Sequence, residues 1–110
     1  MFHMLTCFNL KPDIEFGDFR AAYAEFVEHM RILDLVDRTG PFGQRQSNTI
    51  LDTDGERDHQ YFVTMSFRDR AQSDAAVAHI QRLDEPTLSI HKAIYSKVEK
   101  PVFICWQDMD

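Results

Sequence analysis

Residues 2–10, FHMLTCFNL, contain no Lys, Arg, Asp or Glu and are rich in side chains that favour β-structure. The run stops at Lys11-Pro12-Asp13, which is typical of a turn, so we predict a strand here. Side chains alternate between the two faces of a strand, which makes one face strongly apolar and the other uncharged. The apolar set is Phe2, Met4, Phe8 and Leu10, and the uncharged set is His3, Leu5, Cys7 and Asn9.

A long amphipathic helix is predicted after this strand, because apolar residues recur there at steps of three and four. They are Phe16, Phe19, Tyr23, Phe26, Met30 and Leu33, with Ile32 and Leu35 widening the stripe near its end. Arg38-Thr39-Gly40-Pro41 is predicted to end the helix, since glycine is favoured just past a helix end and proline cannot continue one.

The rest of the chain predicts three more strands and two more helices. Residues 42–51, FGQRQSNTIL, and residues 60–67, QYFVTMSF, predict the second and third strands, and Asp54-Gly55 suits a tight turn between them. Asp69 can cap a helix over residues 70–83, and Pro86 fits the start of a further helix through residue 98. Residues 101–107, PVFICWQ, predict the last strand.

This order of elements predicts a single α+β domain over residues 1–110, with the βαββαβ order of a ferredoxin-like fold and an extra helix before the last strand. Right-handed crossovers place the first and third predicted strands side by side in an antiparallel sheet, with both main helices on one face. The other face then needs a partner, because we expect no charged side chain on its strands in a chain that is 27% charged. Beyond the first strand, that face is expected to carry Phe62, Thr64, Ser66, Phe103, Cys105 and Gln107, with Val102, Ile104 and Trp106 under the helices.

The element order and the uncharged face resemble the dimeric α/β-barrel group of ferredoxin-like proteins, in which two chains press their open sheet faces together. The resemblance covers nearly the whole chain, matches no family motif and is closest to the small members of unassigned function. It implies a homodimer that binds or transforms a small apolar or aromatic molecule in its barrel. The alternative is a non-catalytic structural or stress-related homodimer with a packed interface. Whether the chain is an enzyme stays open, and no catalytic residue carries over.

Six residues are candidates for ligand binding: His3, Cys7, Arg45, Thr64, Ser66 and His91. His91 is predicted to face inward from the added helix, where a core position with one hydrogen bond is the alternative. Arg45 is a forked donor that suits a carboxylate or phenolate if its strand turns it inward; otherwise it lies in solvent. His59 precedes the third predicted strand and is expected to be exposed.

Charge and cysteine content limit the partners further. The net charge of −6 argues against a nucleic acid or an anionic membrane surface as a partner. No segment resembles a membrane span or a signal peptide, so we expect a cytoplasmic protein. Cys7 and Cys105 form no CxxC and are expected to be reduced thiols on neighbouring strands, facing the same side. No metal or cofactor is predicted, because these thiols and His3 have no recognisable ligand spacing.

Overall fold

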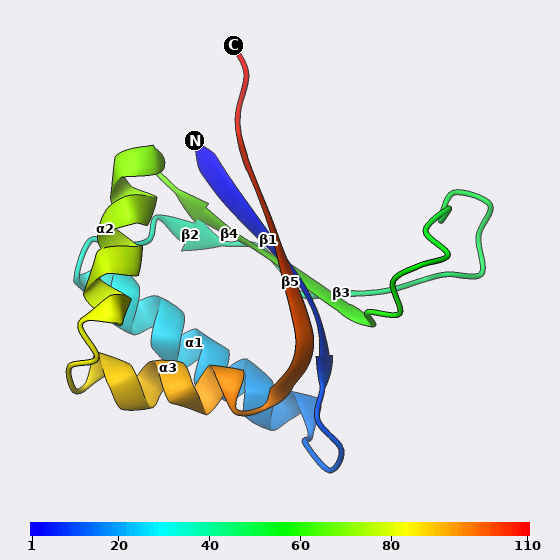
Figure 1. Ribbon diagram of the computed structural model, residues 1–110, viewed down its shortest axis with the longest axis horizontal. Coiled ribbons are helices and arrows are strands. Elements are labelled where there is room, and N and C mark those ends of the chain that lie inside the picture. Colours follow the sequence, from blue (N-terminus) through cyan, green and yellow to red (C-terminus); the bar gives the residue numbers. More distant parts are fainter.

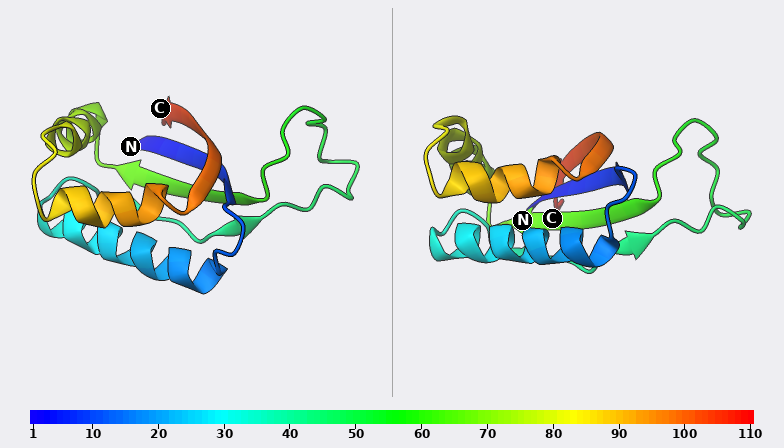
Figure 2. Two further views of the ribbon diagram at one scale, coloured as in Figure 1. Left: turned by 60° about the horizontal axis from the view of Figure 1, so that its bottom comes forward. Right: turned by 90° about the horizontal axis from the view of Figure 1, so that it is seen from below.

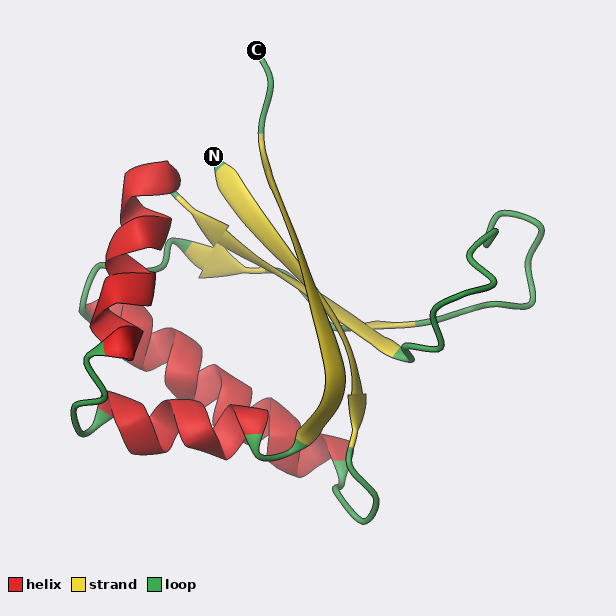
Figure 3. Cartoon of the chain, in the orientation of Figure 1, coloured by secondary structure: helices red, strands yellow, loops and turns green.

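The computed structural model describes residues 1–110 and has the predicted α+β architecture (Figures 1 and 3). The strands are β1 (Phe2–Leu10), β2 (Arg38–Thr39), β3 (Gly43–Gln44), β4 (Tyr61–Phe67) and β5 (Val98–Gln107). The helices are α1 (Phe16–Ile32), α2 (Arg70–Gln81) and α3 (Thr87–Tyr95). None of the three helices is both long enough and apolar enough to cross a membrane.

The sheet is antiparallel, with strand order β2-β4-β1-β5 and with β3 also paired to β4. Leu5 in the middle of β1 lies opposite Thr64 of β4 and Ile104 of β5. The pairing of β1 with β4 confirms the prediction that the first and third predicted strands lie side by side.

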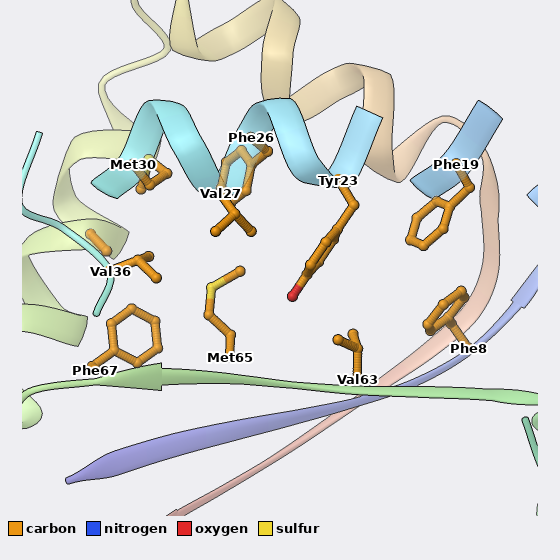
Figure 4. Close-up of a cluster of buried hydrophobic side chains, with 11 residues drawn as sticks. Phe8, Phe19, Tyr23, Phe26, Val27, Met30, Val36, Val63, Met65 and Phe67 are labelled. Atoms are coloured by element: carbon orange, nitrogen blue, oxygen red, sulfur yellow. The ribbon is translucent and has the colours of Figure 1, made fainter. Parts of the chain in front are cut away.

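The apolar stripe of α1 forms the core against one face of this sheet. Figure 4 shows its side chains pointing toward Val63, Met65 and Phe67 of β4. The buried residues of α1 are Phe19, Ala22, Tyr23, Phe26, Val27 and Met30. Phe8 of β1, Phe19 and Met30 are at most 2% exposed. Burying each large apolar side chain contributes about 1.5–3 kcal/mol, so this layer supplies much of the gross stabilisation.

The end of α1 differs from the prediction. The residue with left-handed backbone is Asp34 (φ 58°), and Gly40 has no positive φ. The Leu35 N–H donates to the Met30 carbonyl at 2.8 Å, and the Asp34 N–H donates to the Arg31 carbonyl at 2.9 Å. These two bonds form a Schellman motif, in which Asp34 takes the position that glycine usually fills. The helix therefore ends before Arg38, which lies in β2.

The second predicted strand is also wrong in its bounds. Of residues 42–51, only β3 (Gly43–Gln44) forms a strand, which pairs with β4, and residues 45–60 form a long arm that extends away from the body in Figures 1 and 2. The segment QRQSN has no alternation of apolar and polar side chains that would favour pairing over either face. Asp54 still makes a local turn, because its carboxylate accepts from the Glu56 and Arg57 N–H groups at 2.9 and 3.2 Å.

A single buried hydroxyl joins the three helices. Thr87, at the start of α3, is 4% exposed, and its Oγ1 lies 2.7 Å from His29 Nε2 of α1 and 2.8 Å from His79 Nε2 of α2. The predicted cap of α2 is confirmed, because the Gln72 N–H donates to the Asp69 carboxylate at 2.8 Å. Ala76 of α2 belongs to the buried cluster of α1 and β4, and Ile94 of α3 packs against it, so all three helices lie on one face.

The two faces of β5 are the reverse of the prediction. Leu5 pairs with Ile104 and Met4 pairs with Cys105, so Ile104 lies on the face away from the helices and Cys105 lies on the helix side. The cause is a β-bulge, where the register with β1 shifts between Cys7 and Asn9. One extra residue in a strand turns every later side chain to the opposite face. The open face of β5 therefore carries Val102, Ile104 and Trp106.

Candidate functional site

The helices leave an apolar hollow between themselves and the sheet. A cavity of about 120 Å³ lies between α1, α3 and the strands β1 and β5, and one of about 600 Å³ reaches toward α2. Most of their lining side chains are hydrophobic. Both are lined by Met4, Phe26, Met65, His91 and Phe103. We refer to the two together as the helix-side cavity.

His91 is the central polar group of this cavity. The period of α3 turns it inward, where its half-buried ring lies 5.3 Å from the Phe26 ring and 5.2 Å from the Tyr95 ring, measured between centroids. Neither ring nitrogen hydrogen bonds to the protein, and burial alone lowers the pKa of His91 below its ordinary value. The imidazole is therefore held in its neutral form, with one donor and one acceptor nitrogen available to the cavity.

Several other polar groups around the cavity are already engaged, although the Thr6 and Tyr95 hydroxyls, which also line it, make no hydrogen bond to the protein. Tyr23 is 8% exposed, and its hydroxyl donates to Thr39 Oγ1 at 2.9 Å, while the Thr39 hydroxyl bonds to the Thr64 carbonyl at 3.2 Å. Burial raises the pKa of Tyr23, so its hydroxyl stays protonated. Arg70 and Asp74 pair with each other at 3.1 Å on the exposed side of α2. The arrangement thus suits an apolar ligand with few polar contacts, of which His91 offers the one in the part of the lining that both cavities share.

Three residues form a hydrogen-bonded chain on the open face of the sheet. His3 Nδ1 lies 2.7 Å from Ser66 Oγ, and His3 Nε2 lies 2.8 Å from Asp108 Oδ1. The His3 ring packs on Trp106 at 5.1 Å, and its hydrogen bond lowers the pKa of Asp108. The three residue types are those of a hydrolase triad, but Ser66 is 5% exposed, so a substrate has no access to its hydroxyl. We assign these hydrogen bonds a structural role, which is to hold Asp108 against β1 and β4.

The two cysteines lie on opposite faces of the sheet, contrary to the prediction. Cys7 is buried on the open face, and Cys105 is exposed on the helix side. Both are free thiols, and they cannot form one site because the sheet separates them. Burial raises the pKa of Cys7, with the nearby Arg57 acting in the opposite direction. The Thr64 side chain lies on the open face opposite Leu5.

Arg45 points over the open face, but its guanidinium is already bound. Its Nε and Nη2 atoms donate to the two carboxylate oxygens of Asp52, each at 2.8 Å. Nη2 also donates to the Asp54 carbonyl at 2.7 Å, and Nη1 donates to the Arg57 carbonyl. Arg45 therefore holds the base of the 45–60 arm in one shape, and its donors are not directed at a ligand.

Two residues with a role in these sites were missed by sequence reasoning. Asp108 follows the last strand in a polar tail, where no pattern marks it. His59 was predicted to be exposed, but it is buried, with 5% of its surface exposed, because its Nε2 donates to the Lys100 carbonyl across the sheet. No group of three or more His, Cys, Asp or Glu side chains is placed to hold a metal ion.

No protein-family model matches this sequence, and no curated protein matches it either. Solved structures do match over their full length. At3g17210 from Arabidopsis thaliana superposes with a TM-score of 0.74 at 7% identity, covering 100% of this chain and 97% of that one. SnoaB, a cofactor-independent oxygenase from Streptomyces nogalater, has a TM-score of 0.68 at 10% identity, covering 99% of this chain and 93% of that one.

A third similar structure bears on the topology directly. It is a dimeric protein of unknown function with a ferredoxin-like fold from Bacteroides fragilis, with a TM-score of 0.52 at 10% identity, covering 97% of this chain and 95% of that one. This chain has the ferredoxin-like fold. The similarity confirms the predicted fold class and the resemblance to small dimeric ferredoxin-like proteins, whereas identities this low carry no activity from one protein to another.

Proposed function

We propose that the protein is a homodimer in which each protomer binds a small apolar or aromatic molecule in its helix-side cavity, with His91 as the polar contact. The observation that carries this proposal is the His91 imidazole, which lies in an apolar cavity with neither nitrogen bonded to the protein. The ring is half-buried and its nitrogens stay open to the cavity, so a bound molecule with a hydroxyl group can hydrogen bond to one of them.

The chemistry of the helix-side cavity restricts the class of ligand that can bind there. Aromatic side chains on two sides of His91 suit a flat ring, and the neutral imidazole can accept a hydrogen bond from a hydroxyl group. If the bound molecule reacts, the same nitrogen is placed to accept its proton, since a base with a lowered pKa is free of protons at neutral pH. No charged group lies beside His91 to favour an ionic ligand.

The homodimer is supported by the open face. Ile104 and Trp106 are 45% and 43% exposed there, in line with Leu5 of the central strand. The strip over β1, β4 and the last part of β5 carries no charged side chain, and burying such a strip against a second copy removes apolar area from water. The similar ferredoxin-like protein from Bacteroides fragilis is itself dimeric.

Binding can be tested with 1-naphthol, a two-ring probe with one hydroxyl. A ligand at ten times its Kd adds about 1.4 kcal/mol to the stability of the folded state, which shifts the melting temperature measurably. We expect this shift in the native protein and a smaller one in His91→Phe, which keeps the ring contacts but has no acceptor nitrogen. His29→Phe is the matched control, because His29 does not line the cavity and should leave the response to 1-naphthol intact.

The alternative is a structural homodimer without a ligand. It is favoured by one observation, which is that His91 has no second acid or base within its contacts. Under this alternative, 1-naphthol leaves the melting temperature of the native protein unchanged, and mass spectrometry of the denatured native protein releases no small molecule. Two results would remove His91 from the proposed function. One is a change in melting temperature with 1-naphthol that is the same in the native protein and in His91→Phe, and the other is no change in the native protein.

A further inference from the structure

A second cavity lies on the opposite side of the sheet, where the 45–60 arm begins. Its volume is about 270 Å³. The sheet forms an apolar floor with Leu5, Cys7, Phe62 and Ile104. The arm supplies the polar walls with Arg45, Asp52, Asp54, Arg57 and His59. The sheet separates this cavity from the helix-side cavity.

His59 lines this cavity and has a buried polar atom without a partner in the protein. The residue is 5% exposed, and its Nε2 lies 2.6 Å from the Lys100 carbonyl oxygen. A carbonyl only accepts, so Nε2 carries the hydrogen and Nδ1 of the neutral ring is left as an acceptor. Nδ1 is buried and has no hydrogen-bond partner in the protein. A buried acceptor in that state is rare and calls for a donor from outside the chain.

The charges around the cavity cancel. Arg45 pairs with Asp52 through Nε at 2.8 Å, and Arg57 pairs with Asp54 through Nη1 at 2.6 Å. Each guanidinium therefore has its own carboxylate, and the walls favour neither an anion nor a cation. The Cys7 thiol in the floor is 4% exposed, and burial raises its pKa, so it remains an uncharged, weakly polar part of the floor.

We propose that this cavity is a second ligand site, which takes a small neutral molecule with an apolar ring and one hydroxyl or N–H group that donates to Nδ1 of His59. The apolar floor contacts the ring, and the single acceptor fixes its orientation. This site is distinct from the ligand site at His91, because its residues come from the other face of the sheet and do not include His91. It shares Leu5 and Ile104 with the open face of the proposed homodimer, so in that homodimer the second copy lies over the bound molecule.

Phenol and anisole form a matched pair of probes, since anisole has the same ring but its oxygen cannot donate. We expect phenol to bind the native protein roughly two- to tenfold more tightly than anisole, the ratio that one neutral hydrogen bond supplies. Nitrogen-15 NMR of the histidine rings should show His59 as the Nε2–H form, with its Nδ1 resonance moving when phenol binds. The backbone amides of Leu5 and Phe62 should shift with it.

The same titration in His91→Phe separates the two sites. Phenol binding at His59 should persist in that variant, whereas His59→Leu should lose the preference for phenol over anisole. Because His59→Leu also leaves the Lys100 carbonyl without its donor and can unfold for that reason, the comparison of the two probes in the native chain stands by itself.

Three results would overturn this inference: equal affinity for phenol and anisole, amide shifts confined to α3 and the helix side, or no change at His59 with phenol at tens of millimolar. The last result would mean that water alone satisfies Nδ1. None of them bears on ligand binding at His91, which is tested separately with 1-naphthol.

Discussion

Replacing His91 by phenylalanine should make the protein more stable. The imidazole makes ring contacts with Phe26 and Tyr95 but no hydrogen bond to the protein, and phenylalanine preserves the ring contacts. The imidazole is partly desolvated without a hydrogen bond to the protein, whereas phenylalanine is an apolar ring in an apolar cavity, so we expect a gain of about 1 kcal/mol, the low end of the roughly 1–3 kcal/mol that a fully buried unsatisfied group costs. With an unfolding entropy of about 2.1 cal/mol/K for each residue of this 110-residue chain, that gain raises the melting temperature by about 4 °C.

The gain should grow in mild acid. Burial lowers the pKa of His91 in the folded protein, so the unfolded chain takes up a proton first as the pH falls below about 6.5. The native protein therefore has the full contribution of neutral His91 above that pH and loses stability as the pH falls toward the lowered value. His91→Phe has no such group, so the difference in melting temperature between the variant and the native protein should be larger at about pH 5 than at about pH 7.

Thermal unfolding followed by circular dichroism measures both effects, and His79→Phe is the matched control. His79 Nε2 bonds to Thr87 Oγ1 at 2.8 Å, so its replacement removes a hydrogen bond and should lower stability by about 1 kcal/mol. A loss of stability in His91→Phe similar to that in His79→Phe would refute the reasoning. It would show that the His91 nitrogens have a structural partner and are not held ready for a ligand.

Two further outcomes test the open face and the arm. The native protein should sediment at twice the 12.9 kDa of one chain. Leu5→Asp should abolish the dimer, because it buries an unpaired carboxylate in both subunits, whereas Glu25→Ala, at an exposed position, should leave the dimer intact. A native protein that sediments as a monomer would contradict this prediction. The hydrogen bond from Arg57 lowers the pKa of Asp54 to about 2, so carbon-13 NMR should show this carboxyl titrating near that value. The ion pair should stabilise the protein fully above the ordinary pKa of 3.8, and this stabilisation should be lost as the pH falls toward 2. Arg57→Ala should return the titration midpoint toward 3.8, and an unchanged midpoint would exclude Arg57 as the cause.

Most of the fold was predictable because its strongest signals are local. The stripe of α1, the Asp69 cap of α2 and the alternation in β1 and β4 each depend on a few neighbouring residues, and the structure confirms them. The second predicted strand failed because the polar segment after Gln44 forms ion pairs within the arm in place of a ladder. Side chains that bond to one another within a loop leave no hydrophobic period in the sequence.

The candidate sites were predictable only in part. The period of the added helix placed His91 inward, whereas the burial of His59 depends on a carbonyl that is 41 residues away in the chain. Likewise, His3 was placed on the open face by alternation, but its partner Asp108 lies 105 residues away. Contacts between residues so far apart in sequence are set by the strand register, which no short pattern contains.

The bulge in β5 means that the number of residues at this point of the strand, more than their type, decides which side chains lie on the open face. The side chains on either face of β5 are apolar enough to lie under the helices or on the open face. The extra residue between Glu99 and Val102 decides which set faces the helices. A relative with one residue fewer at this point would turn the rest of the strand over without a single substitution. It would place Phe103 and Cys105 on the open face and the indole of Trp106 among the helices. An alignment of such chains by residue type alone would then equate side chains that lie on opposite faces of the sheet.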